Sequence, residues 1–190
     1  MERNLTLIVL FSALIVVLGL VPAIPLGFGV PITMQSLGVM LAGAVLGSWR
    51  GALAVLLVQF LVALGLPVLA GGRGGLGVFV GPTAGFLIGW LPAAFVTGLV
   101  VERIRALPVA IGAGIGAALG GIVVLYALGI GGFWLFKNAA LQPGDTPMSL
   151  WAATLIMAPF IPGDMVKVVL AGLIARTIAR YRPSALIARS

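Results

Sequence analysis

The chain has 190 residues, of which 62% are hydrophobic and only 8% are charged. A soluble domain cannot cover its surface with so few charges, so the composition predicts a single integral membrane domain, residues 1–190. Each helical span needs about 20 residues, so the length leaves no room for a separate soluble enzyme domain. The sequence has no cysteine and no histidine, which excludes disulfides, thiol catalysis and the usual transition-metal sites.

Apolar runs separated by charged or Gly/Pro-rich breaks predict an all-α membrane protein with six transmembrane helices. The first run is expected to be retained as a helix, because no convincing signal-peptide cleavage site follows it. Pro159 and Pro162 are expected to break or kink the last run, so that its crossing extends from about Pro162 to Tyr181. In chain order the predicted spans are about 5–22, 33–48, 51–66, 83–101, 108–129 and 151–180.

The basic residues indicate how the helices are oriented. With the N-terminus in the cytoplasm, only Arg73 and Lys137 fall in outer loops, whereas eight arginines fall on the cytoplasmic side. This bias predicts a multi-pass membrane protein with both termini in the cytoplasm. Topology thus accounts for the net charge of +7, and we expect contact with anionic membrane lipid but no nucleic acid partner. The eight are Arg3, Arg50, Arg103, Arg105, Arg176, Arg180, Arg182 and Arg189.

Asp164 and Lys167 lie three residues apart within the last predicted span. Side chains at that spacing share a helix face, and charges inside a span are costly unless they face the protein interior. A helix rise of about 1.5 Å per residue places Gln59 and Trp90 at the same depths on other spans, and Gln35 nearer the outer side. This polar layer predicts a ligand site, and the alternative is an ion pair that only fixes helix packing.

The predicted outer loops are rich in glycine and apolar residues rather than in charge. The second loop contains Gly74 and Gly75 next to Arg73, and the first includes Phe28. Loops of this kind can lie close over a cavity, where backbone groups bond a ligand directly, although flexible tethers are the alternative. The guanidinium of Arg73 is suited to a carboxylate that enters from outside, and the alternative is a solvated loop charge.

Two glycine patterns need a separate interpretation. Gly72, Gly74 and Gly77 match the spacing of a dinucleotide fingerprint, but that motif requires a βαβ unit and is rejected between two spans. Rows of glycines spaced four residues apart allow helices to approach closely. Packing within one chain is the preferred meaning, and assembly into a homo-oligomer is the alternative. The rows are Gly43/Gly47/Gly51, Gly81/Gly85/Gly89 and Gly112/Gly116/Gly120.

Four motifs follow one another in order along most of the chain: PITMQSLGV at 31–39, AGGRGGLG at 70–77, GPTAGF at 81–86 and PGDMVK at 162–167. Each motif alone would be weak, but their order and separation are specific. Together they make the chain resemble the BioY family, the biotin-specific substrate-binding subunits (S components) of energy-coupling-factor (ECF) transporters.

The resemblance implies an ECF S-component-like bundle of six spans in the bacterial cytoplasmic (inner) membrane. Such a bundle captures biotin under its outer loops and imports it. The resemblance also implies an ECF transmembrane coupling protein and ATPase subunits as partners, although some members are thought to transport biotin without a dedicated energising module. S components tend to dock the coupling protein through an Ala-x-x-x-Ala face on the first helix. This chain departs from that pattern, with Ser12/Val16 and Ala13/Val17 in its place. Whether an ATPase module is required therefore stays open.

The resemblance further implies a site that binds biotin as a transported ligand, with no cofactor. Asp164 would accept hydrogen bonds from the ureido N–H groups of biotin. Lys167 would donate to the ureido carbonyl while Arg73 holds the carboxylate, or Lys167 would hold a folded-back carboxylate itself. The other substrate-binding residues expected are Gln35, Trp90, Phe28, Gly74 and Gly75.

Other functions stay open at this point. The same fold could serve a different vitamin, or the chain could be a stand-alone ion-coupled carrier that uses Asp164 and Lys167 as a relay. A membrane scaffold packed through its glycine rows would need no ligand. An enzyme is the least favoured class, because the sequence shows no nucleophile–base pair and no metal-binding set.

Overall fold

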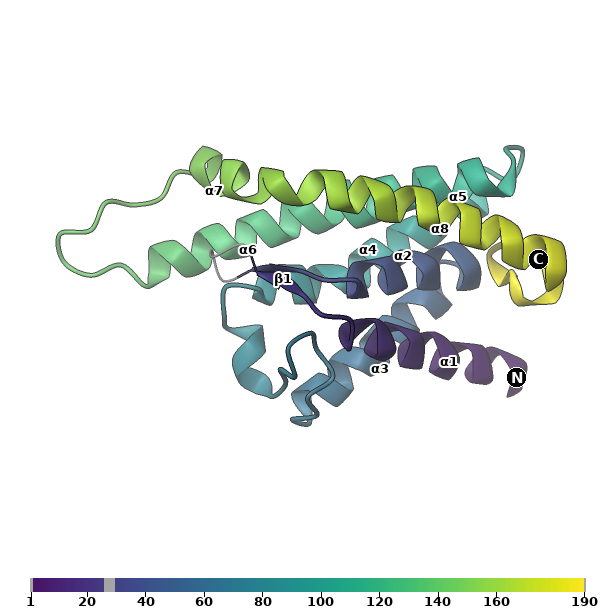
Figure 1. Ribbon diagram of the computed structural model, residues 1–190, viewed down its shortest axis with the longest axis horizontal. Coiled ribbons are helices and arrows are strands. Elements are labelled where there is room, and N and C mark those ends of the chain that lie inside the picture. The colour runs from purple at the N-terminus through teal and green to yellow at the C-terminus, as the bar shows by residue number, and fades with distance from the viewer. Residues whose placement is uncertain (1, 26–29, 190) are drawn as a thin grey trace.

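The computed structural model describes residues 2–25 and 30–189, which form an elongated helical bundle with both ends of the chain at the same end of the bundle (Figure 1). The α-helices are α1 (Glu2–Gly19), α2 (Gln35–Leu46), α3 (Ser48–Ala63), α4 (Ala84–Arg103), α5 (Val109–Ala118), α6 (Leu125–Ala139), α7 (Leu150–Met157) and α8 (Ile161–Tyr181). A π-helical turn, η2, covers Leu119–Val124, and 3-10 turns cover η1 (Leu76–Phe79), η3 (Ala158–Phe160), η4 (Pro183–Ala185) and η5 (Ile187–Arg189). Strand β1 (Ile24–Pro25) pairs antiparallel with β2 (Pro31–Ile32).

Consecutive helices join into longer rods. One rod, Val109–Ala139, contains α5, η2 and α6, and another, Leu150–Tyr181, contains α7, η3 and α8. Together with α1 and α4, they are the four helices of the described chain that are long and apolar enough to cross a membrane. Helices α2 and α3 are apolar but have only 12 and 16 residues. These helices confirm the predicted helical membrane protein.

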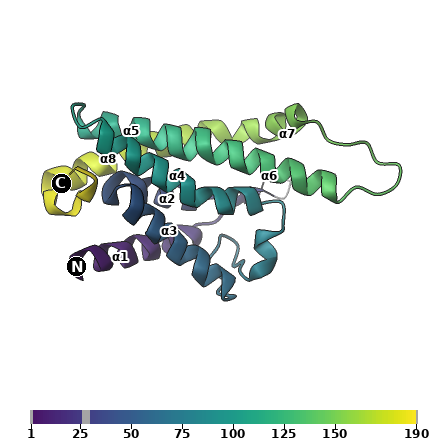
Figure 2. The ribbon, with the colours of Figure 1, turned by 180° about the vertical axis from the view of Figure 1, so that it is seen from behind.

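Two predicted boundaries differ from the structure. The fifth predicted span, 108–129, was too short, because the helix continues to Ala139. Gly132 does not end this helix: a Cβ there would meet the Cα and N atoms of Gly85, so glycine allows α6 to lie against α4. The interruption expected at Pro159 and Pro162 is confined to the 3-10 turn η3. Pro162 lies in the first turn of α8, and α8 continues in the direction of α7 (Figures 1 and 2).

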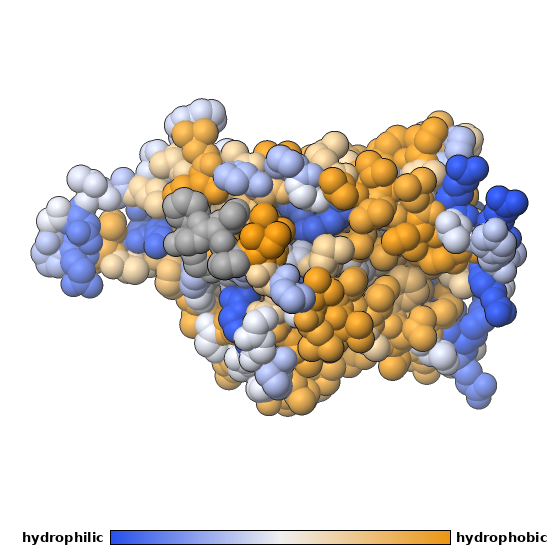
Figure 3. Space-filling view, in the orientation of Figure 1, coloured by the Kyte–Doolittle hydropathy of each residue, from blue (hydrophilic) through white to orange (hydrophobic). Residues whose placement is uncertain are grey.

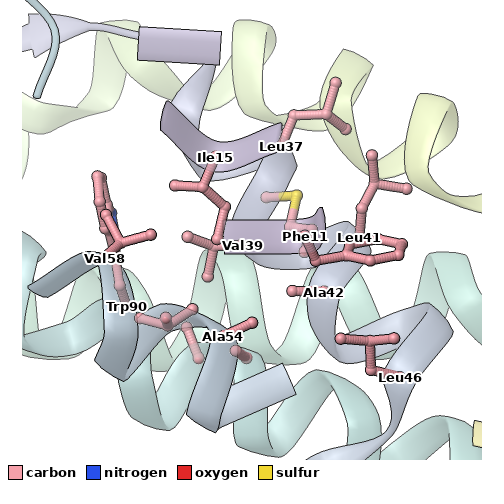
Figure 4. Close-up of a cluster of buried hydrophobic side chains, with 14 of the residues drawn as sticks. Phe11, Ile15, Leu37, Val39, Leu41, Ala42, Leu46, Ala54, Val58 and Trp90 are labelled. Atoms are coloured by element: carbon pink, nitrogen blue, oxygen red, sulfur yellow. The ribbon is translucent and has the colours of Figure 1, made fainter. Parts of the chain in front are cut away.

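Helix α4 lies in the middle of the bundle and contacts α2, α3, α5 and α6. The largest buried cluster draws mainly on the first four helices and extends to α5, α6 and α8. Its members include Ile15, Val39, Val58 and Trp90 (Figure 4). Lipid is as apolar as these side chains, so close packing rather than the hydrophobic effect holds membrane helices together.

Glycines bring the helices into close packing. A Cβ on Gly43 would meet backbone atoms of α4, and a Cβ on Gly116 or Gly120 would meet Thr97. The glycine rows at these positions therefore pack within the chain, as expected.

The surface matches a membrane environment. On the face that Figure 3 shows, hydrophilic residues gather at the two ends of the molecule, and most of the surface between them is hydrophobic. Large apolar side chains project outward there, such as Leu53 and Phe60 of α3 and Val166 and Val169 of α8. These side chains are suited to contact lipid, whereas charged groups collect where water and head groups are present.

Candidate functional site

A cavity lies where α2, α4, α6 and α8 meet the segments that precede α2 and α4. It contains about 660 Å³ of space that no atom fills, some of it open to solvent. Of this space, about 80 Å³ admits the centres of water-sized molecules. Small-molecule sites combine a mostly apolar wall with a few polar groups. The wall here includes the aromatic rings of Phe86, Trp90 and Phe160. Its polar residues are Thr33, Gln35, Ser36, Arg73, Thr83, Tyr126, Asp164 and Lys167.

Asp164 and Lys167 form a buried ion pair on the cavity side of α8. The Lys167 Nζ atom lies 2.7 Å from Asp164 Oδ1, and the two residues are 5% and 7% exposed respectively. The ammonium also donates to the Thr33 carbonyl at 2.7 Å and to Ser36 Oγ at 2.9 Å. Each N–H group of the ammonium thus has an acceptor within the protein. The prediction that both charges face the interior is confirmed.

Tyr126 of α6 provides a further partner for the acid. Its hydroxyl donates to Asp164 Oδ2 at 2.6 Å, and the residue is 8% exposed. Sequence reasoning missed this residue. The available signal was weak: Tyr126 is one of only two tyrosines, and its phenol falls within an otherwise apolar span.

Arg73 reaches the cavity from a tight hairpin. Leu69 and Arg73 pair across it, and Gly71 and Gly72 make the turn with φ values of +78° and +69°, which favour glycine. The Arg73 guanidinium donates from Nε to the Ala70 carbonyl at 3.1 Å and from Nη1 to Thr83 Oγ1 at 3.4 Å. The side chain is half-buried, and the guanidinium has further N–H groups that a ligand anion can use.

Gln35 lines the cavity but its amide is engaged by the protein. Nε2 donates to the carbonyls of Ile15 at 3.2 Å and Val68 at 3.0 Å, and Oε1 accepts from the Ala70 N–H at 2.9 Å. The residue is 1% exposed. Gln35 therefore ties α1 and the Arg73 hairpin to α2, and its place in the site is as a support for that hairpin.

The remaining predicted residues divide into three cases. Trp90 lines the cavity while it also packs in the core. Gly74 and Gly75 do not line the cavity: Gly74 lies against the Leu66 carbonyl, and the Gly75 N–H donates to the Val62 carbonyl at 2.8 Å. Phe28 lies outside the described residues.

All four sequence motifs meet at this cavity. The first provides Thr33 and Ser36, the second Arg73, and the third Thr83 and Phe86. The fourth provides the ion pair on α8. Segments that are far apart in sequence thus converge on one polar, buried site.

Comparison with known proteins identifies the family. The model of the BioY family matches residues 2–184, which is nearly the whole chain. The chain belongs to the BioY family. The resemblance predicted from the four motifs is therefore confirmed.

Relatives of high similarity carry the same family name. The biotin transporter BioY of Rhodobacter capsulatus is 82% identical over 189 residues, with 100% of both chains covered. The biotin transporter BioY of Rhizobium etli is 52% identical over 182 residues, covering 93% of this chain and 92% of the relative. These BioY relatives are named as transporters, in agreement with the expectation that the chain is not an enzyme.

A solved structure has the same fold. It is the crystal structure of the S-component for biotin from an ECF-type ABC transporter. The TM-score is 0.87 at 30% sequence identity, and the match covers 97% of this chain and 96% of that one. The S-component-like bundle implied by the BioY resemblance is thus confirmed as a fold.

Proposed function

We propose that this chain captures biotin from outside the cell and takes part in its uptake as the S component of an ECF-type transporter. The observation that carries the proposal is the buried Asp164 carboxylate, which lines one cavity together with Lys167 and Arg73. Buried charges inside a membrane protein are costly and typically mark a substrate pathway. Family membership and the names of the relatives support biotin as the substrate.

Asp164 is the proposed acceptor for the ureido ring of biotin. The ring presents two N–H donors, and a carboxylate in a dry site makes strong, charge-assisted hydrogen bonds to such donors. Tyr126 and Lys167 each take one site on the carboxylate, which has about four lone-pair sites in all. The sites that remain are suited to the ring.

Arg73 is the proposed partner of the biotin carboxylate. Every N–H group of Lys167 already has an acceptor in the protein, whereas the Arg73 guanidinium keeps N–H groups for an anion. This difference favours Arg73 over Lys167, the two alternatives that the sequence left open. Trp90 supplies an apolar wall for the rest of the ligand.

The proposed topology has six spans, with α2 and α3 as the two short ones. Both ends of the chain lie at one end of the bundle, where hydrophilic residues gather, as they would at the cytoplasmic face (Figures 1 and 3). The distribution of arginines along the sequence supports placing that end on the cytoplasmic side of the membrane. The cavity then opens toward the outer side.

An ECF coupling protein and ATPase subunits are the proposed partners. On α1 the Ala13/Val17 face is exposed, whereas Ser12 is buried and its hydroxyl donates to the Ala54 carbonyl of α3 at 2.8 Å. We therefore propose the Ala13/Val17 face as the docking surface. Assembly of this chain into a homo-oligomer is a separate proposal. It is tested by measuring the size of the purified protein in detergent.

Binding by the purified chain tests the proposed function. We expect labelled biotin to bind tightly, with no competition by thiamine or riboflavin, and biotin to co-purify from biotin-fed cells as identified by mass spectrometry. Asp164→Asn should weaken binding at least a hundredfold, which corresponds to about 2.7 kcal/mol, while the protein still inserts. Displacement by another vitamin, or unchanged affinity of the variant, would contradict the proposal.

A further inference from the structure

The Tyr126 hydroxyl binds the Asp164 carboxylate oxygen that Lys167 does not contact. It donates to Oδ2 at 2.6 Å, while the ammonium donates to Oδ1 at 2.7 Å. Because the donors come from different helices and reach different oxygens, they resist rotation of the carboxylate about its bond to the chain. The orientation of the remaining lone pairs is then set before a ligand arrives.

The ring of Tyr126 is itself fixed by its neighbours. It packs edge-on against Phe86, with the ring centroids 6.2 Å apart and an interplanar angle of 83°. Phe86 lies against Gly129, one turn along α6, where an added Cβ would meet the Phe86 ring. The absence of a side chain at Gly129 thus allows the contact between the two aromatic rings.

The π-helical turn η2 sets the register of Tyr126. It ends at Val124, two residues before the tyrosine. A π-helical turn holds one more residue than an α-helical turn, so it rotates the following helix by about 100° relative to a regular α-helix. Gly120 allows this wider turn to pack against α4, because an added Cβ would meet Ala93 O and Thr97 Oγ1. The turn therefore determines which face of α6 meets Asp164.

We propose that Tyr126 is a positioning residue for ligand recognition: its hydroxyl orients the Asp164 carboxylate toward the cavity. This inference rests on the proposed role of Asp164 as the ureido acceptor. Tyr126 acts through Asp164, so its contribution to biotin binding depends on the presence of the carboxylate.

A double-mutant cycle measures that dependence. Tyr126→Phe removes only the hydroxyl, and we expect biotin affinity to fall about tenfold, the loss typical of one hydrogen bond to a charged group. In the Asp164→Asn background the same substitution should change affinity less than about twofold, because the charged acceptor is gone. Tyr181→Phe is the matched control, since Tyr181 is 69% exposed, and it should leave affinity unchanged. Equal losses in both backgrounds, or no loss in the wild type, would overturn the inference.

Infrared spectroscopy of the ligand-free protein tests the contact independently of biotin. The chain has only four acidic side chains, so the band lost in Asp164→Asn identifies the Asp164 carboxylate. Tyr126→Phe should shift this band and Tyr181→Phe should not. An unshifted band would overturn the inference. If the wild type failed to bind biotin, the proposed function would fail, and a shifted band would still support Tyr126 as the group that orients Asp164.

Discussion

Helix α8 carries charged residues in two stretches with opposite surroundings. Near its beginning, Asp164 and Lys167 are buried and have protein partners within 2.9 Å. Near its end, Arg176 and Arg180 are exposed. The exposed arginines can be solvated by water or head groups, whereas the buried pair depends on the protein for every interaction.

This difference shows which charges point to function. An exposed charge at a helix end costs little, so its presence needs no explanation beyond topology. A buried ion pair loses its hydration, and apolar residues of similar volume often replace such pairs without loss of stability. Asp164 and Lys167 therefore contribute something other than stability, and a polar ligand in the adjoining cavity is the explanation that the geometry supports.

Removal of one member of the buried pair should give the largest effect. Lys167→Met leaves the Asp164 carboxylate without its cation, so we expect the free energy of unfolding to fall by about 3–5 kcal/mol and biotin binding to be lost. Arg176→Met on the same helix should change stability by less than about 0.5 kcal/mol. Denaturant unfolding in detergent, followed by tryptophan fluorescence, measures both variants. Equal changes in the free energy of unfolding for the two variants would show that the buried and exposed charges of α8 do not differ in their contribution to stability.

Replacement of the whole buried cluster should separate stability from binding. Asp164→Leu and Lys167→Met are combined with Tyr126→Phe, because the phenol would otherwise lose its acceptor. We expect this triple variant to regain at least about 2 kcal/mol of the stability that Lys167→Met loses, yet to bind no biotin. A triple variant as unstable as Lys167→Met would mean that the pair itself holds the fold together.

A smaller effect is expected at Arg73, which is only half-buried. Arg73→Gln should weaken biotin binding about tenfold and should weaken binding of biotin amide less than about twofold, because the amide has no carboxylate. Arg180→Gln, a control among the exposed arginines, should leave both affinities unchanged. Equal weakening of the two ligands by Arg73→Gln would exclude Arg73 as the carboxylate partner.

The contrast along α8 also shows what sequence can predict. Hydropathy and the three-residue spacing are patterns among residues that are close together in the sequence. They therefore predicted the helical membrane fold and the shared inward face of Asp164 and Lys167. The contacts between distant segments were not predicted. Lys167 bonds Thr33 from 134 residues away, and Tyr126 reaches Asp164 across 38 residues.

The geometry of the loops could not be predicted from local sequence patterns either. The glycine-rich segment was expected to offer backbone groups to a ligand, but Gly75 uses its N–H on the Val62 carbonyl and Gly74 lies against Leu66. Gln35 was expected as a ligand contact; it lines the cavity, but its amide bonds three backbone groups, one on α1 and two on the Arg73 hairpin. Which hydrogen-bonding groups stay available for a ligand depends on tertiary contacts that no local pattern records.

A last prediction concerns how α8 is held in place. An added Cβ on Gly172 would lie 2.6 Å from the Ala110 carbonyl of α5, whereas one on Gly163 would meet no described atom within 4 Å. We therefore expect Gly172→Ala to lower the free energy of unfolding by about 1–3 kcal/mol through overpacking. Gly163→Ala should leave stability unchanged or raise it by up to about 1 kcal/mol, the gain in helix propensity.

Unfolding in detergent compares the two glycine variants under identical conditions. A larger loss for Gly163→Ala would contradict the packing difference. The expected result would mean that α8 is anchored against α5 by its second half. The first half, which bears the Asp164 carboxylate, makes polar contacts at the cavity, where a ligand can compete for or reinforce them.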